Sequence, residues 1–120
     1  MIHIAIADDH ALIINGLQKI IAADPELEVT GAYDNGDSLL NGLLQQQPDI
    51  LLLDIQMPGK SGIELAGIIS KKYPAVKIIA LTNIEVLPQV KKMMRQGCSG
   101  YLLKDVEPEL LISSIRKVYE

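Results

Sequence analysis

Short apolar segments alternate with longer segments of helical period along the whole chain. The apolar segments are rich in Ile, Val and Leu, as β-strands are, and they span residues 2–7, 28–33, 49–54, 76–81 and 100–104. Between and after them, apolar residues recur at helical spacing over residues 11–23, 36–46, 62–72, 85–96 and 107–119. The pattern therefore predicts five successive strand–helix units, (βα)5, in one domain.

The third apolar segment shows no polar alternation, since Ile50 to Leu53 are all aliphatic. Such a continuous run is typical of a strand that helices cover on both faces, as happens in parallel sheets. Pro25, Pro48 and Pro74 each fall between a predicted helix and the next strand, where turns are needed. We therefore expect an α/β fold with a doubly wound, five-stranded parallel sheet.

The composition of the chain excludes some classes of function and indicates a single small domain. The 120 residues suit one domain, and the absence of Phe and Trp leaves aliphatic residues to fill the core. A formal charge of −4 argues against sequence-independent nucleic-acid binding, so any DNA contact should belong to another domain. Cys98, the only cysteine, is expected to be a small buried residue. With no secretory signal and no membrane segment, a cytoplasmic protein is expected.

Polar side chains follow four of the five predicted strands. Asp8 and Asp9 come after the first strand, Asp54 ends the third, Thr82 follows the fourth, and Lys104 ends the fifth. In an open parallel sheet, ligands bind beyond the carboxyl ends of the strands. Taken singly, each residue also has an ordinary interpretation as a turn, a helix cap or a solvated side chain. Their joint placement favours a common site.

Three carboxylates in one pocket require a cation, and oxygen ligands of this kind suit Mg²⁺ or Ca²⁺. For Mg²⁺, Asp9 and Asp54 are expected to bind directly, with Asp8 acting through water and a loop carbonyl filling another position. A hydroxyl from Thr82, the ammonium of Lys104 and a metal around one carboxylate make a phosphoryl-transfer site. Asp54 is then the nucleophile.

The two histidines are left outside this predicted site. His10 starts a helix directly after the two acids, but imidazole suits softer metals than an oxygen-rich site binds, so a ligand role is not favoured. His3 lies inside the first strand and is expected to be a partly buried structural residue.

Four motifs together resemble the response-regulator receiver family of two-component systems, over the whole chain. They are Asp8-Asp9-His10, Asp54-Ile55-Gln56-Met57-Pro58 followed by Gly62, Ala80-Leu81-Thr82, and Gly100-Tyr101-Leu102-Leu103-Lys104. The first and last look like the LuxR/FixJ-type (NarL-like) class of transcriptional regulators in particular. The resemblance implies that residues 1–120 form a receiver domain with a flavodoxin-like fold and strand order 2-1-3-4-5.

The resemblance also implies roles for single residues. Asp54 would take a phosphoryl group from a histidine kinase, while Asp9, Asp54 and the backbone carbonyl of Gln56 would bind Mg²⁺. Asp8 would assist through water, and Lys104 would bind the phosphate.

By the same resemblance, Thr82 and Tyr101 would report phosphorylation, and the face made by the fourth helix, fifth strand and fifth helix would contact a partner. The protein would be a signalling switch rather than an enzyme, with a phosphorylation-dependent homodimer as its expected active form. A helix-turn-helix domain normally follows such receivers; here the chain stops at Glu120, so DNA binding is expected only through a domain not in this chain.

Two departures from the family pattern concern the pocket. Asp105 stands where many receivers have Pro, which puts a cis peptide after Lys104 in doubt, and Asn83 stands where a small residue is common. Gln56 and Ile84 are expected to line the approach of the water that removes the phosphoryl group. Because Ile84 can only crowd that water, slow self-dephosphorylation is expected.

Two other functions remain as alternatives. A haloacid-dehalogenase-like phosphatase also uses an Asp nucleophile and Mg²⁺, but it needs a second Asp where Gln56 stands. A flavodoxin-like cofactor-binding module would need a loop rich in Gly or hydroxyl groups where Asp8 and Asp9 stand, and these acids would repel a cofactor phosphate.

Overall fold

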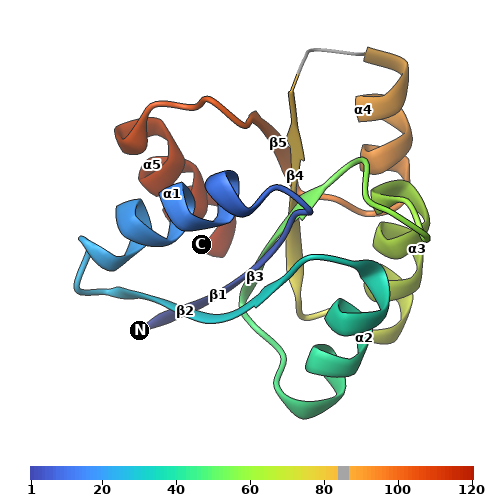
Figure 1. Ribbon diagram of the computed structural model, residues 1–120, viewed down its shortest axis with the longest axis horizontal. Helices are drawn as coiled ribbons and strands as arrows, with labels where there is room; N and C mark the ends of the chain where they lie inside the picture. The colour runs from blue at the N-terminus through green and yellow to red at the C-terminus, as the bar shows by residue number, and fades with distance from the viewer. Residues whose placement is uncertain (84–86) are drawn as a thin grey trace.

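The computed structural model describes residues 1–83 and 87–120, and it has one five-stranded parallel sheet in the order β2-β1-β3-β4-β5 (Figure 1). The strands are β1 (Ile2–Ala7), β2 (Leu27–Tyr33), β3 (Ile50–Asp54), β4 (Lys77–Thr82) and β5 (Gly100–Leu103). The helices are α1 (Ala11–Ala22), α2 (Gly36–Gln45), α3 (Gly62–Lys72), α4 (Leu87–Arg95) and α5 (Pro108–Tyr119). The predicted fold class, element order and strand order are confirmed.

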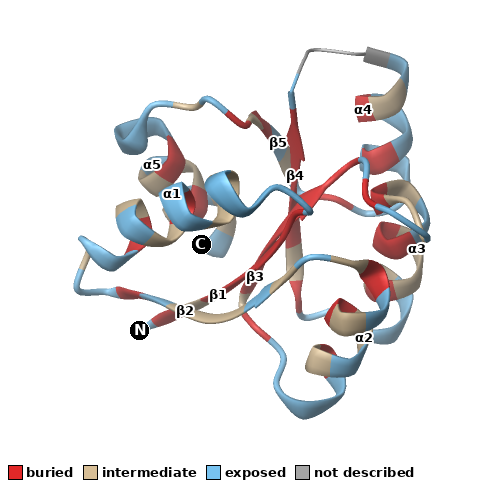
Figure 2. Cartoon of the chain, in the orientation of Figure 1, coloured by how far each residue is buried: buried red, intermediate tan, exposed pale blue. Residues whose placement is uncertain are grey.

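Helices cover both faces of the sheet, with α1 and α5 on one side and α2, α3 and α4 on the other (Figure 1). Successive strand residues point to opposite faces, so β1 sends Ile4 and Ile6 toward α1 and α5, and Ala5 and Ala7 toward the opposite helices. The core therefore consists of two aliphatic layers separated by the sheet (Figure 2).

Strand β3 occupies the middle of the sheet, and all five of its residues are buried. Its neighbours are β1 and β4, both parallel to it, with Leu53 beside Ala7 and Asp54 beside Leu81. The continuous apolar run thus has the expected cause, a strand covered on both faces. It delivers the Asp54 carboxylate to the centre of the carboxyl edge.

Helix starts follow local sequence signals. The Asn35 side chain accepts a hydrogen bond from the N–H of Ser38 at 2.8 Å, the Ser61 hydroxyl accepts one from Glu64 at 3.2 Å, and Pro108 opens α5. Apart from the start of α4, the observed boundaries coincide with the predicted ones or differ from them by one residue. The first two positions predicted for the fourth helix, 85 and 86, lie outside the described residues.

Smaller expectations can be compared directly. Cys98 is buried and unpaired, His3 is half-buried, and the peptide bond after Lys104 is trans, since no described peptide is cis. Within residues 1–83 and 87–120, no helix has the length and apolar character needed to cross a bilayer.

Candidate functional site

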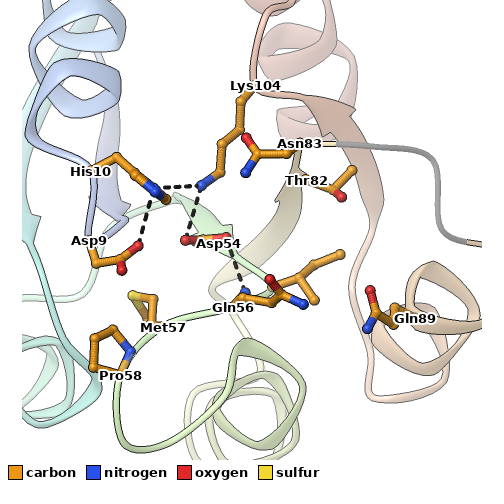
Figure 3. A pocket seen from close by; sticks show the side chains of 11 residues that line it. Asp9, His10, Asp54, Gln56, Met57, Pro58, Thr82, Asn83, Gln89 and Lys104 are labelled. Atoms are coloured by element: carbon orange, nitrogen blue, oxygen red, sulfur yellow. Dashed lines mark hydrogen bonds and ion pairs between the residues drawn. The ribbon is translucent and has the colours of Figure 1, made fainter.

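A cavity of about 600 Å³ opens at the carboxyl ends of β1, β3, β4 and β5 (Figure 3). It lies where the sheet argument places a ligand site. The residues that line it are Asp9, His10, Asp54, Ile55, Gln56, Met57, Pro58, Thr82, Asn83, Gln89 and Lys104.

Asp54 is the most buried acid that lines the cavity, with 3% of its surface exposed. Its Oδ1 accepts a hydrogen bond from the main-chain N–H of Gln56 at 3.1 Å, and its Oδ2 lies 3.1 Å from Nζ of Lys104. The short turn after β3 therefore folds back onto the carboxylate. Both contacts hold Asp54 in one orientation at the floor of the cavity.

The close approach of α3 fixes that turn. The N–H of Gly62 donates to the carbonyl of Ile55 at 2.8 Å, and a Cβ on Gly62 would lie 2.7 Å from the Ile55 Cα and overlap the Asp54 carbonyl oxygen. Only glycine allows this packing. The Gly62 that follows the Asp54 motif thus has a direct steric role beside the buried acid.

Asp8 lies beneath the cavity wall and is fully buried. Its Oδ2 is 2.9 Å from Nζ of Lys104, whose side chain is only 4% exposed. Lys104 comes directly after β5, and its main-chain N–H donates to the carbonyl of Thr82 at 2.8 Å. A single buried ammonium thus stands between two buried carboxylates.

Burial raises the pKa of Asp54 to about 6, and the negative charge of Asp8 adds to this effect. The Gln56 N–H and the Lys104 ammonium act in the opposite direction and do not cancel it. The metal-free pocket therefore disfavours its own negative charge. An added cation would relieve that cost.

The donor atoms fit such a cation. Oδ2 of Asp8 and Oδ2 of Asp54 are buried, and among the described residues their close contact is the ion pair that each makes with Lys104. Ligand atoms of Asp8, Asp9, His10 and Asp54 all lie within 4.8 Å of one another. Carboxylate oxygens are the protein ligands that Mg²⁺ prefers, so the donor set of this cluster suits that ion.

His10 belongs to this cluster, which the sequence interpretation did not favour. Its Nδ1 lies 2.9 Å from Oδ1 of Asp8. The same atom lies 3.2 Å from Oδ1 of Asp9 and 3.2 Å from Nζ of Lys104 (Figure 3). The residue is the N-cap of α1, and its extended backbone turns the ring back toward the acids. Its position directly after Asp9 was the available signal.

The remaining predicted residues divide into two groups. The buried Thr82 lines the cavity, as do the exposed Gln56 and Asn83. Tyr101 does not line it: its side chain is 39% exposed on β5. Ile84, expected to crowd the attacking water, lies outside the described residues.

Four further residues line the cavity without having been predicted to act there: Ile55, Met57, Pro58 and Gln89. Met57 and Pro58 follow the nucleophile motif and form one wall. Gln89 enters from α4 and points toward the opening (Figure 3). Only the packing of α4 brings it near, so no local sequence signal identified it.

Comparison with known proteins matches this geometry. The family model described as "Response regulator receiver domain" matches residues 4–116. The uncharacterized transcriptional regulatory protein YxjL of Bacillus subtilis (strain 168) is 40% identical over 115 residues, which is 96% of this chain and 53% of that protein. The transcriptional regulatory protein DegU of Brevibacillus brevis is 34% identical over 98% of this chain and 50% of its own length.

A solved structure agrees as well. A LuxR-family DNA-binding response regulator from Staphylococcus aureus superposes with a TM-score of 0.92 at 27% identity, over 100% of both chains. The chain spans about half the length of the curated relatives it matches. Neither the phosphatase nor the cofactor-binding alternative receives support. The chain therefore belongs to the response-regulator receiver family, the phosphorylation-controlled switch domain of two-component signal transduction, and its relatives are transcriptional regulators.

Proposed function

We propose that Asp54 is the phosphoacceptor and that the surrounding residues catalyse its phosphorylation in the presence of Mg²⁺. The observation that carries this proposal is the buried Asp54 carboxylate at the end of the central strand, 3.1 Å from the Lys104 ammonium and open to the cavity. A carboxylate held in this way can attack phosphorus, and a nearby cation can compensate the charge on the transferred group.

In the proposed reaction, an Asp54 oxygen forms a bond to phosphorus while the bond from phosphorus to the donor breaks. The donor is a kinase phosphohistidine or a small acyl phosphate. The electron pair of the broken bond leaves with the histidine in the first case and with the carboxylate in the second. The Lys104 ammonium then forms an ion pair with the new phosphoryl oxygens, and the Thr82 hydroxyl donates a hydrogen bond to one of them.

For the metal, we assign Asp9, Asp54 and the Gln56 carbonyl as direct ligands and Asp8 as a ligand through water. When bound, Mg²⁺ supplies positive charge that offsets the repulsion between the carboxylates and the incoming phosphoryl group. The crowding of acids around one ammonium supports this assignment.

Acetyl phosphate with Mg²⁺ provides the direct test. The purified domain should gain the mass of one phosphoryl group, and that group should be released by hydroxylamine as an acyl phosphate is. Asp54→Asn or removal of Mg²⁺ should prevent the gain. Asp49→Asn is the matched control, because Asp49 precedes the other end of the same strand and accepts a hydrogen bond from the N–H of His3. Undiminished labelling of Asp54→Asn would refute the assignment.

The output is proposed from the relatives. Response regulators work with histidine kinases, and the relatives include DNA-binding LuxR-family regulators.

We place the protein in the cytoplasm and propose that phosphorylation promotes a homodimer through the face of α4, β5 and α5. Exposed Met94 and Tyr101 on that face support the proposal. Sedimentation of the domain with and without beryllofluoride should show a mass increase only with the phosphate mimic; an unchanged monomer would contradict it.

A further inference from the structure

The imidazole of His10 contacts two acids of the cluster, although about half of its side chain is exposed to solvent. Nδ1 makes two contacts with carboxylate oxygens, at 2.9 Å to Asp8 and 3.2 Å to Asp9, and the side chain is 53% exposed. We propose that His10 is a direct metal ligand through Nδ1, and that it gives the site a preference for Mn²⁺, Co²⁺ and related transition-metal ions over Mg²⁺. This inference rests on the proposed divalent-cation site.

The spacing of the donor atoms suits an octahedral ion. Two neighbouring ligands at about 2.1 Å from such an ion are separated by about 3.0 Å, the edge of the octahedron. The separation of 3.2 Å between Nδ1 of His10 and Oδ1 of Asp9, the acid assigned as a direct ligand, is close to that edge. One ion can therefore bind Nδ1 of His10 and Oδ1 of Asp9 at adjacent positions of its coordination shell.

A second observation shows that the acids have capacity left for an ion. Oδ2 of Asp8 and Oδ2 of Asp54 belong to residues that are 0% and 3% exposed, and no described residue donates a hydrogen bond to them. Lys104 offers one ammonium to both carboxylates and lies 3.2 Å from Nδ1 of His10 as well. The single positive charge of Lys104 thus pairs with two carboxylates, and negative charge is left for a divalent ion to neutralise.

Donor chemistry determines the expected selectivity. Mg²⁺ favours oxygen ligands and retains its waters, so it gains little from an imidazole. Ions later in the first transition row bind nitrogen donors more strongly, in the order Mn²⁺, Co²⁺, Ni²⁺. Replacing His10 should therefore weaken binding of Co²⁺ and Ni²⁺ while leaving Mg²⁺ binding nearly unchanged.

The chain offers a matched control, because His3 is its only other histidine. It stands near the start of β1, the strand that Asp8 and Asp9 follow, where its ring lies 3.6 Å from Asp49 and 4.0 Å from Glu28. His10→Gln and His3→Gln therefore make the same chemical change on an imidazole near two acids, but only the first touches the cavity.

The experiment is pulsed electron paramagnetic resonance of the Mn²⁺-loaded domain. Imidazole ¹⁴N coupling is expected in the native protein and in His3→Gln, and it should be absent from His10→Gln. Labelling histidine with ¹⁵N in the native protein should change the coupling pattern, which provides a readout that needs no variant. By competition calorimetry, His10→Gln should lower Co²⁺ affinity about tenfold or more and Mg²⁺ affinity less than about threefold.

The outcomes separate the two proposals. If the domain binds no divalent ion, the proposed function itself fails. If Mn²⁺ binds without nitrogen coupling, or if His10→Gln lowers Mg²⁺ and Co²⁺ affinity equally, the role of His10 is overturned while the phosphoryl-transfer proposal stands.

Discussion

The main-chain N–H of Lys104 donates to the carbonyl of Thr82 at 2.8 Å, which ties the end of β4 to the residue after β5. The two side chains reach the same cavity. Because this tie uses backbone atoms only, a change of either side chain leaves the spacing of the two strand ends in place. The roles of the hydroxyl and of the ammonium can therefore be tested separately.

Thr82→Ala should still be phosphorylated, since the loss of one hydrogen bond to the phosphoryl group lowers the rate by no more than about tenfold. The conformational response should nevertheless be lost, because no hydroxyl draws the end of β4 toward the phosphate. NMR amide shifts at Tyr101 and along α5 measure that response. Thr82→Ser retains the hydroxyl and should preserve it. A full shift at Tyr101 in Thr82→Ala would contradict the coupling.

Asp54→Asn should stabilise the metal-free domain at neutral pH. Because the folded pKa of Asp54 is about 6 and its ordinary value is 3.8, the folded state binds a proton more tightly than the unfolded state. The corresponding stability is fully present below about pH 4 and is lost as the pH rises through about 6. The variant should therefore gain up to about 3 kcal/mol at about pH 7, and the difference should shrink toward about pH 4.

Urea unfolding across this pH range measures the effect, with Asp49→Asn as the control that should show little of it. Saturating Mg²⁺ should stabilise the native protein and remove most of the advantage of Asp54→Asn. A variant no more stable than the native domain at neutral pH, without metal, would show that the pocket carries no such charge penalty.

Gly62→Ala should destabilise the domain by about 1–3 kcal/mol, because the added methyl overlaps the backbone of the turn that carries Asp54. Gly16→Ala is the matched control. Gly16 lies inside α1 with nothing within 4 Å of an added Cβ, so the change should stabilise by about 0.5–1 kcal/mol. Thermal unfolding of both variants tests the contrast, and equal effects would refute the steric explanation.

Cys98 should react slowly with thiol reagents in the folded protein. Burial raises the pKa of its thiol to about 12, so almost no thiolate exists at neutral pH. The reaction with Ellman's reagent should proceed at the rate of local opening and become fast in denaturant. Rapid labelling of the native domain would mean that the region after α4 opens readily.

The sequence predicted best those features of the fold for which a residue pattern has a single physical explanation. The run from Ile50 to Leu53 predicted a strand buried on both faces, and strand ends predicted which acids meet, because all parallel strands end at the same edge. The positions of individual side chains around the cavity could not be predicted in the same way. The contact of His10 with Asp8 depends on the backbone angles of a helix cap, and the position of Gln89 depends on how α4 packs.

The position of α5 affects how this protein can fold during synthesis. Leu111 and Ile115 complete the layer that covers Ile79, Leu81 and Leu102, and both are fully buried. The strands on that side are made before this helix leaves the ribosome, so their aliphatic surface stays open to solvent and to chaperones until residues 108–119 emerge. The acidic pocket, which needs β5 and its following lysine, is therefore among the last parts of this domain to form.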